Sequence, residues 1–320
     1  MIRVLFAGSP EAAKKTLEIL CNAQSQAGFE VAGVLTNPPS AKGRHKALIP
    51  TPVAQFAQEQ GLPVLTPAHL DSQAREEVRP LKADLLVCFA YGHIFGPKFL
   101  ELFPLGGINL HPSLLPKYRG CTPVPAAILN RDKETAVTIQ TLGLKMDEGD
   151  ILAQSLVQLN GSETGESLLN YCAEEGAKLI LEVIKKCSDL GKLPQGCPQS
   201  GQPSYTGIIT KEDGRIDWKE SAAVIEAKIR AYYPEPGCWC MEGETSLRIL
   251  EAKLFDGVDA SLNTEGEAGS VLAFSKSDGI LIKTGDGILA VRKLQRQGKN
   301  AMDYKSFMNG ARNFIGTVLQ

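Results

Sequence analysis

The first half of the chain alternates short apolar runs with stretches in which apolar residues recur at helical spacing. This alternation predicts an α/β domain. Strands are expected at residues 2–7, 31–36, 62–65, 84–90, 107–111, 135–142 and 151–157. The run at 84–90 is apolar on both faces, which is typical of a central parallel strand. The runs at 135–142 and 151–157 alternate apolar with polar residues, which indicates antiparallel or edge strands.

Two helices and a connecting segment complete this half. After the first strand, Ser9 is expected to be the N-cap of a helix and Pro10 its first residue. A long helix is predicted over residues 164–190, where apolar side chains form one stripe. Residues 191–207 are rich in Gly, Pro, Ser and Gln. That composition predicts a linker, so the first domain should span residues 1–190.

Beyond the linker, residues 208–320 show short apolar runs separated by Gly-rich turns. Strands are expected at residues 247–255, 270–274, 279–283 and 287–294, and one helix at 221–231. Short strands with such turns predict a small β-barrel as a second domain. Cys238 and Cys240 form the tightest cysteine pair, and we interpret them as alternate positions on a strand rather than as metal ligands.

Charge and composition narrow the function. The 320 residues are 43% hydrophobic and 22% charged, which excludes wholesale disorder, collagen and a coiled coil. The net charge of −2 excludes a global polycation. Residues 292–312 are a local exception, because they contain six basic residues and one acidic residue, Asp303, which gives a net charge of +5. A solvated face is the usual meaning of such a run, and a phosphate-binding surface is the alternative. The chain has no membrane-length apolar run or signal peptide, so a cytoplasmic protein with reduced thiols is expected.

The strongest chemical signal lies at the end of the strand predicted at 107–111. Asn109 and His111 are two residues apart, which puts both side chains on one face of a strand. Pro112 ends the strand, and the apolar loop that follows suggests a wall for a flat ligand. The alternative is a buried Asn and His that hold a turn. A second string, residues 146–152, reads as an ordinary acidic turn unless Asp147 reaches His111.

Residues 109–120 read NLHPSLLPKYRG, and Asp147 follows His111 by 36 positions. In these features the chain resembles the 10-formyltetrahydrofolate-dependent formyltransferases. Further matching strings are FAGSP, AKGRHKALIPTPV, VCFAYGHIFGP, ITKEDGRIDW and IRAYYPEPGCW, which run from end to end of the chain. The resemblance is greatest to the members that formylate initiator methionyl-tRNA. It departs at Tyr118, where many relatives have Trp, without loss of a catalytic group.

The resemblance implies a Rossmann-like formyltransferase domain followed by an OB-like β-barrel that binds tRNA. The positions that match the family's catalytic residues are Asn109, His111 and Asp147. Those that match its folate contacts are Ser113, Leu114, Leu115, Pro116, Ala90 and Tyr91. Arg44 matches the basic loop that enters the acceptor stem of tRNA. The resemblance thus implies 10-formyltetrahydrofolate as formyl donor and initiator methionyl-tRNA as partner. The histidines form no metal constellation, no apolar run suggests membrane association, and nothing in the sequence requires more than a monomer.

The chemistry of acyl transfer suggests how these residues act. Asn109 and His111 are expected to donate hydrogen bonds to the oxyanion, and a nearby carboxylate should favour the imidazolium form of His111. Asp147 should orient His111 and help to remove the proton of the attacking amine. Two alternatives stay open. One is a formyltransferase for an amino-sugar nucleotide or a glycinamide, and the other is a non-catalytic tRNA- or folate-binding protein.

Overall fold

A computed structural model describes residues 1–42, 47–257, 265–311 and 313–320 of the chain. It divides the chain into two compact units. The first comprises Met1–Pro123, Glu134–Gln158 and Leu168–Gly207, and the second comprises Val124–Lys133, Leu159–Ser167 and Ile208–Gln320. In the described part of the chain, no helix is both long enough and apolar enough to cross a membrane.

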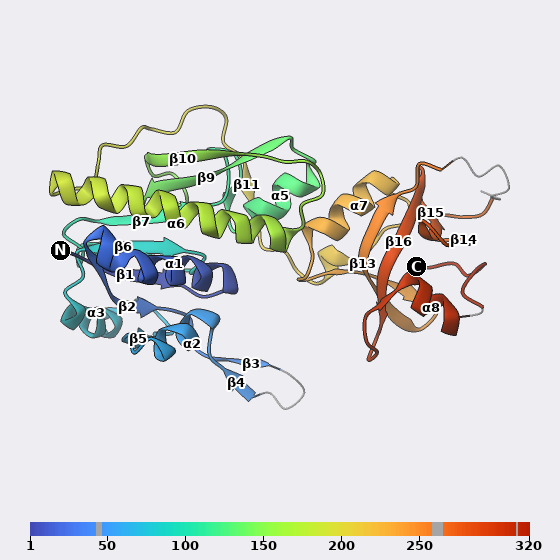
Figure 1. Cartoon of the computed structure of the whole chain (residues 1–320), viewed down its shortest axis with the longest axis horizontal. Coiled ribbons are helices and arrows are strands. Elements are labelled where there is room, and N and C mark those ends of the chain that lie inside the picture. Colours follow the sequence, from blue (N-terminus) through green and yellow to red (C-terminus); the bar gives the residue numbers. More distant parts are fainter. Residues whose placement is uncertain (43–46, 258–264, 312) are drawn as a thin grey trace. The chain divides into compact units, whose positions relative to one another are not determined.

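The first unit is built on a seven-stranded sheet with the order β10-β9-β7-β6-β1-β2-β5 (Figure 1). Its strands are β1 (Ile2–Gly8), β2 (Phe29–Leu35), β5 (Val64–Leu65), β6 (Leu85–Phe89), β7 (Gly107–His111), β9 (Glu134–Thr141) and β10 (Ile151–Gln158). Strand β6 pairs in parallel with both β1 and β7, which confirms the central strand predicted from its apolar run. Strand β9 is antiparallel to both of its neighbours, which confirms the antiparallel or edge strand predicted at residues 135–142.

Helices and short strands complete this part of the fold. The helices are α1 (Glu11–Ala27), α2 (Pro52–Glu59), α3 (Ser72–Val78), α4 (Pro97–Leu100) and most of α6 (Gly165–Leu190). Helix α5 (Pro123–Leu129) belongs from Val124 onward to the second unit. The short strand pairs are β3 (Ser40–Lys42) with β4 (Ala47–Ile49), and β8 (Arg119–Gly120) with β11 (Tyr205–Thr206). The long helix α6 packs closely over β7, because a Cβ at Gly176 would lie 2.0 Å from Leu110 Cδ1. Thr16 of α1 donates a hydrogen bond to the Ala173 carbonyl of α6 at 3.0 Å, which joins the two helices.

The start of α1 differs from the prediction. The helix begins at Glu11 with Pro10 as its N-cap residue, so the expected N-cap at Ser9 is wrong. The Ser9 hydroxyl accepts a hydrogen bond from the Asn37 amide at 3.1 Å and lies 3.2 Å from Thr36 Oγ1. It therefore ties the end of β1 to the residues that follow β2, and it is not available to the first turn of the helix.

Residues 191–207, predicted as a linker, are held against the first unit. Cys197 and Ile151 exchange two backbone hydrogen bonds, at 2.8 and 2.9 Å, at the edge strand β10. Farther on, β11 pairs in parallel with β8. These bonds bring the segment next to the residues that follow β7.

The second unit is built on an antiparallel sheet. The C-terminal domain that was predicted as a small β-barrel is thus confirmed as a sheet domain. Its six strands are β12 (Cys238–Glu242), β13 (Thr245–Leu254), β14 (Val271–Ser275), β15 (Gly279–Lys283), β16 (Ile288–Arg296) and β17 (Met302–Asp303). Helices α7 (Ala222–Ala231) and α8 (Tyr304–Gly310) accompany them. The Ser221 hydroxyl accepts from the Val224 amide and caps α7. Cys238 and Cys240 occupy alternate, buried positions of β12, as interpreted from their spacing.

Candidate active site

A row of side chains crosses the first sheet and turns from apolar to polar at β7. Ala7, Cys88, Asn109 and Gln140 are direct neighbours on β1, β6, β7 and β9. Directly paired residues carry their side chains on one face of a sheet. Burial raises the pKa of the Cys88 thiol to about 12, so this neighbour of Asn109 stays protonated. Asn109 and Gln140 are therefore the groups in this row that can make strong hydrogen bonds.

Asp147 reaches this row from the loop between β9 and β10. Its Oδ1 accepts hydrogen bonds from Gln140 Nε2 at 2.8 Å and from Asn109 Nδ2 at 3.4 Å. Its Oδ2 accepts from the Gly120 amide at 2.8 Å. The Asp147 side chain is only 11% exposed. The acidic turn is thus brought to the strand that bears Asn109, which its sequence alone did not settle.

His111 completes the cluster. Its Nδ1 lies 3.5 Å from Asp147 Oδ1, and its Nε2 lies 2.9 Å from the Tyr118 carbonyl oxygen. A carbonyl only accepts hydrogen bonds, so Nε2 must carry a proton. The structure therefore brings together the three residues that the family motif matched, and the remaining ring nitrogen faces the carboxylate.

The protonation state of His111 differs from the expectation. Burial lowers the pKa of His111 below its ordinary value, and it outweighs the opposing attraction of Asp147 and the bond to Tyr118. The ring is therefore neutral near pH 7, and the expected imidazolium is wrong. A neutral ring that is protonated on Nε2 presents the lone pair of Nδ1, which is a proton acceptor.

The loop after His111 is largely packed inside the protein. Ser113 is fully buried, its hydroxyl donates to the Lys117 carbonyl at 2.6 Å, and its carbonyl accepts from Thr138 Oγ1 at 2.7 Å. Leu115 and Pro116 are also buried, whereas Leu114 is half-buried. The hydroxyl of Ser113 thus holds its own loop together.

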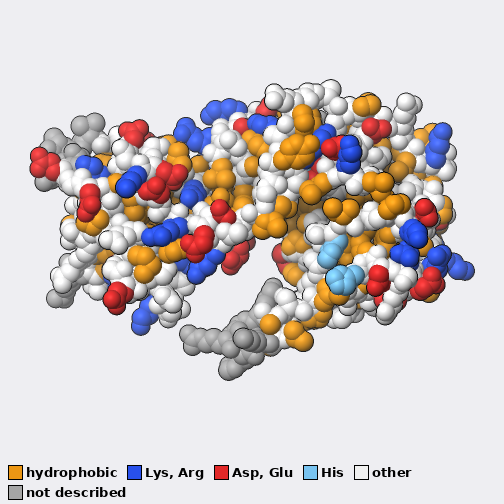
Figure 2. All heavy atoms as spheres, turned by 180° about the vertical axis from the view of Figure 1, so that it is seen from behind, with side chains coloured by type: hydrophobic (Ala, Val, Ile, Leu, Met, Phe, Trp, Pro, Cys, Tyr) orange, Lys and Arg blue, Asp and Glu red, His pale blue; other side chains and the backbone are white. Residues whose placement is uncertain are grey.

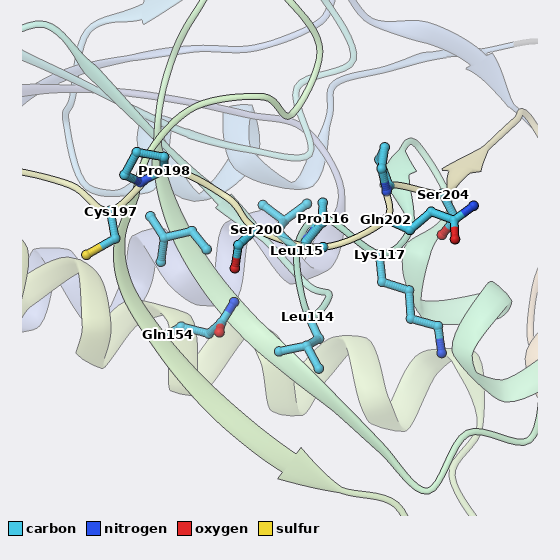
Figure 3. A pocket seen from close by; sticks show the side chains of 13 residues that line it. Leu114, Leu115, Pro116, Lys117, Gln154, Cys197, Pro198, Ser200, Gln202 and Ser204 are labelled. Atoms are coloured by element: carbon cyan, nitrogen blue, oxygen red, sulfur yellow. The ribbon is translucent and has the colours of Figure 1, made fainter.

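Leu114, Leu115, Pro116 and Lys117 line a groove of about 810 Å³ (Figure 3). The lining comes from the loop after β7, from β10 and from residues 197–204. None of its 13 lining residues, all described by the structure, belongs to the Asn109, His111 and Asp147 cluster. The structure therefore places Leu114, Leu115 and Pro116 in this groove, apart from the three polar side chains.

The two other predicted folate positions follow β6. Ala90 is exposed and has a φ of +51°, and Tyr91 is buried with its ring 5.6 Å from that of Phe95. Burial raises the pKa of Tyr91 to about 12, and its hydroxyl has no hydrogen-bond partner among the described residues. On the same loop Ile94 is 64% exposed, and beside Asp147 Leu144 and Met146 are 61% and 53% exposed. Such apolar side chains on two loops suit a flat, partly apolar ligand.

Sequence reasoning missed two glutamines, Gln140 and Gln199. Gln140 donates directly to the Asp147 carboxylate, and Gln199 donates to the Asp147 backbone carbonyl at 2.8 Å. The alternation of β9 could have put Gln140 on the face of Asn109, once the two strands were known to pair. No periodicity or motif marks Gln199, which lies in the segment predicted as a linker.

Arg44, the predicted tRNA contact, lies outside the described residues, as does its neighbour His45. In the basic run of the second unit, Arg296 forms two hydrogen bonds with Glu242, at 2.7 and 2.6 Å. Arg292 donates to the Ser277 and Asp278 carbonyls. Two of the basic groups are thus engaged within the fold, whereas the exposed basic residues in the described part of the run are Lys293, Lys299 and Lys305. Figure 2 shows basic and acidic side chains interspersed over the face that it draws.

The cluster does not resemble a metal centre. In the parts of the chain that the structure describes, no group of three or more His, Cys, Asp or Glu side chains is arranged to hold a metal ion. What the cluster offers is an amide donor on Asn109, a carboxylate on Asp147 and a neutral imidazole on His111, all on one face of the sheet. This set suits proton transfer beside a group that develops negative charge.

Comparison with known proteins finds family matches in both the N-terminal and the C-terminal part of the chain. Residues 2–184 match the formyl transferase family, and residues 208–312 match the formyl transferase C-terminal domain. The chain is 45% identical to the methionyl-tRNA formyltransferase of Treponema denticola, with 98% of each chain covered. Among solved structures, the methionyl-tRNA formyltransferase of Clostridium thermocellum aligns with a TM-score of 0.56 and 16% identity, over 80% of this chain and 95% of that one. WlaRD, a sugar 3N-formyl transferase, aligns with a TM-score of 0.62 and 19% identity, over 94% of this chain and 99% of that one.

Proposed function

The chain belongs to the formyl transferase family, and from that premise we propose that it formylates methionyl initiator tRNA. The formyl group comes from 10-formyltetrahydrofolate, and the products are N-formylmethionyl-tRNA and tetrahydrofolate. The observation that carries the chemistry is the convergence of Asn109 and His111 on one oxygen of Asp147, at 3.4 and 3.5 Å. The observation that favours this acceptor is the 45% identity to a methionyl-tRNA formyltransferase along the whole chain.

The reaction begins with attack of the methionyl amine on the formyl carbon. A carbon–nitrogen bond forms, and the electron pair of the formyl C=O moves onto its oxygen. Asn109 stabilises this oxygen, because Nδ2 carries two hydrogens and Asp147 occupies only one of them. The position of Asn109 on β7 already orients its amide, so the amide needs no rearrangement when the charge develops.

Asp147 and His111 handle the proton that the attacking amine must lose. The carboxylate accepts it directly, and the free Nδ1 of the neutral His111 ring is the second acceptor beside it. A ring that takes up this proton becomes positive while the oxyanion is still present. Its positive charge therefore stabilises the negative charge on that oxygen. The oxyanion then collapses, the bond from the formyl carbon to the folate nitrogen breaks, and that nitrogen takes up a proton.

The formyl donor is proposed from the chemistry of the loops around the cluster. The exposed Ile94, Leu144 and Met146 provide apolar surface on the loops that carry Ala90 and Asp147. A pterin ring is flat and partly apolar, and contact with such side chains removes apolar surface from water. The groove lined by Leu114, Leu115 and Pro116 is a second surface, on which the rest of the folate can lie.

The tRNA contacts are proposed from the family match. Arg44 lies in the loop AKGRHKALIPTPV and is assigned to the acceptor stem, and the exposed lysines of residues 292–312 are assigned to phosphates. All three catalytic side chains come from one chain, so a monomer suffices. The proposed substrate, a charged initiator tRNA, favours a cytoplasmic location.

The acceptor is tested by transfer of labelled formyl from 10-formyltetrahydrofolate. Charged methionyl initiator tRNA, the same tRNA without methionine, and an amino-sugar nucleotide are offered in parallel. We expect label on the charged tRNA alone. Label on the sugar alone would keep the mechanism and overturn the acceptor. Binding of tRNA without transfer to any amine would favour the non-catalytic alternative.

A further inference from the structure

Gln199 has a complete set of hydrogen bonds around the loop that carries Asp147. Its Nε2 donates to the Asp147 carbonyl at 2.8 Å and to the Gly149 carbonyl at 2.8 Å. Its Oε1 accepts from Arg119 Nη2 at 2.8 Å and from Arg119 Nε at 3.1 Å. A guanidinium only donates and a carbonyl only accepts, so the amide can face its partners in one orientation only.

The backbone that Gln199 holds is not one that a peptide adopts readily. Asp147 has a φ of +54°, in the left-handed region that residues other than glycine rarely occupy. Such a residue persists where its surroundings over-determine its conformation. Gln199 constrains the backbone of Asp147 through its carbonyl, and Gln140 and the Gly120 amide bind the Asp147 carboxylate.

Arg119 fixes Gln199 in turn. Its side chain is 11% exposed, and Nη1 lies 3.2 Å from Glu148 Oε1 and donates to the Tyr205 hydroxyl at 3.1 Å. Glu148 follows Asp147 directly, so Arg119 and Gln199 grip adjacent residues of one turn. The pairing of β8 with β11 holds Arg119 and Tyr205 side by side. The turn is thus clamped from a segment more than fifty residues farther along the chain.

We propose that Gln199 is a positioning residue for formyl transfer, which acts by holding the Asp147 turn so that its carboxylate faces Asn109 and His111. This inference rests on the proposed role of Asp147 in the reaction. It makes residues 191–207 part of the active site rather than a passive connection. Gln199 itself touches no reacting atom, so its loss should change turnover and leave substrate affinity in place.

Two substitutions separate the two halves of the amide. Gln199→Met keeps the length of the side chain and removes all five of its hydrogen bonds, including the one from Nε2 to Gln140 Oε1 at 3.3 Å. Gln199→Glu keeps an acceptor for Arg119 and places a second oxygen against the Asp147 and Gly149 carbonyls, where a donor is needed. Gln195→Met is the matched control, because Gln195 is exposed in the same segment and lies outside the cluster.

We expect kcat to fall about 10- to 100-fold in both Gln199 variants, since small displacements of a catalytic group cost this much. KM for methionyl-tRNA and for the formyl donor should stay within about twofold of wild type. The glutamate variant should be at least as impaired as the methionine variant. Wild-type kcat in either variant, an effect on KM alone, or an equal loss in Gln195→Met would overturn the inference.

Hydrogen exchange gives a readout that does not depend on activity. The Gly149 amide donates to Gln140 Oε1 at 3.2 Å, and the Asp150 amide donates to Thr141 Oγ1 at 2.9 Å. Both amides should exchange faster in the Gln199 variants than in wild type and Gln195→Met, while the amides of β6 and β7 should not change. Unchanged exchange in residues 142–150 would refute the clamp. Faster exchange in an enzyme whose wild type forms no formylmethionyl-tRNA would refute the proposed function and keep the clamp.

Discussion

Replacing Gly149 by alanine should disable the enzyme, although Gly149 is two residues from Asp147, the nearest side chain that we propose to be catalytic. A Cβ at this position would lie 1.8 Å from the Thr141 carbonyl oxygen, whereas real Cβ contacts are at least 3.0 Å. The turn must therefore move by about 1.2 Å, the difference between these distances. Flexible side chains cannot relieve the clash, because its partner is the backbone of β9.

A shift of this size is large for the Asp147 carboxylate. Its bonds to Gln140 and to the Gly120 amide are each 2.8 Å long and cannot all survive it. A misplacement of about 1 Å costs about 100-fold in rate, which corresponds to about 2.7 kcal/mol of transition-state stabilisation. The overpacked turn should also destabilise the protein by about 1–3 kcal/mol.

The assay is the initial rate of formylmethionyl-tRNA formation, with kcat and KM determined separately and thermal unfolding followed in parallel. Gly143→Ala is the control in the same loop, because no atom lies within 4 Å of a Cβ there. We expect kcat to fall in Gly149→Ala and to stay unchanged in Gly143→Ala. A wild-type kcat in Gly149→Ala, or an equal loss in both variants, would refute the reasoning.

Three further predictions concern single residues. Asn109→Ala should lower kcat by about 10²–10³-fold, the usual cost of one oxyanion donor, and an unchanged unfolding temperature would show that the fold is kept. The lowered pKa of His111 means that the unfolded chain binds more protons than the folded one below about pH 6.5. Stability should therefore be fully present above that pH and fall on acidification by up to about 1.4 kcal/mol per pH unit, and a His111→Gln variant that keeps the same slope in urea unfolding would contradict this. Arg44→Ala should raise KM for methionyl-tRNA and leave the affinity for the formyl donor intact, so an unchanged dependence of rate on tRNA concentration would reject the assigned contact.

The fold was predictable where each face of a strand or helix is uniformly buried or uniformly exposed along its length. Strand β6 lies between two parallel neighbours and is apolar on both faces, and the stripe of α6 covers β7. The error at Ser9 arose because its hydroxyl has two possible uses, capping α1 or joining the ends of β1 and β2. Such a choice depends on the residues around Asn37, which no local pattern reveals.

The sequence predicted the pair Asn109 and His111, but it did not predict the residues that hold Asp147 in place. The spacing of Asn109 and His111 gave their common face, but only the family motif joined Asp147 to them. Neighbouring charge alone suggested an imidazolium, whereas the burial that lowers the pKa of His111 is a property of the packed structure. Gln199 lies in a segment without periodicity, so its role depends on contacts with residues 52 and 50 positions away.

Single-turnover transfer by Asp147→Asn tests the central claim most directly. The carboxylate accepts from three donors, so an amide in its place turns a donor toward a donor and also removes the proton acceptor. With saturating formyl donor and methionyl-tRNA, we predict that the rate falls by at least about 10²-fold while both substrates still bind. A folded Asp147→Asn enzyme that transfers formyl at the wild-type rate would contradict the assignment of this cluster as the active site.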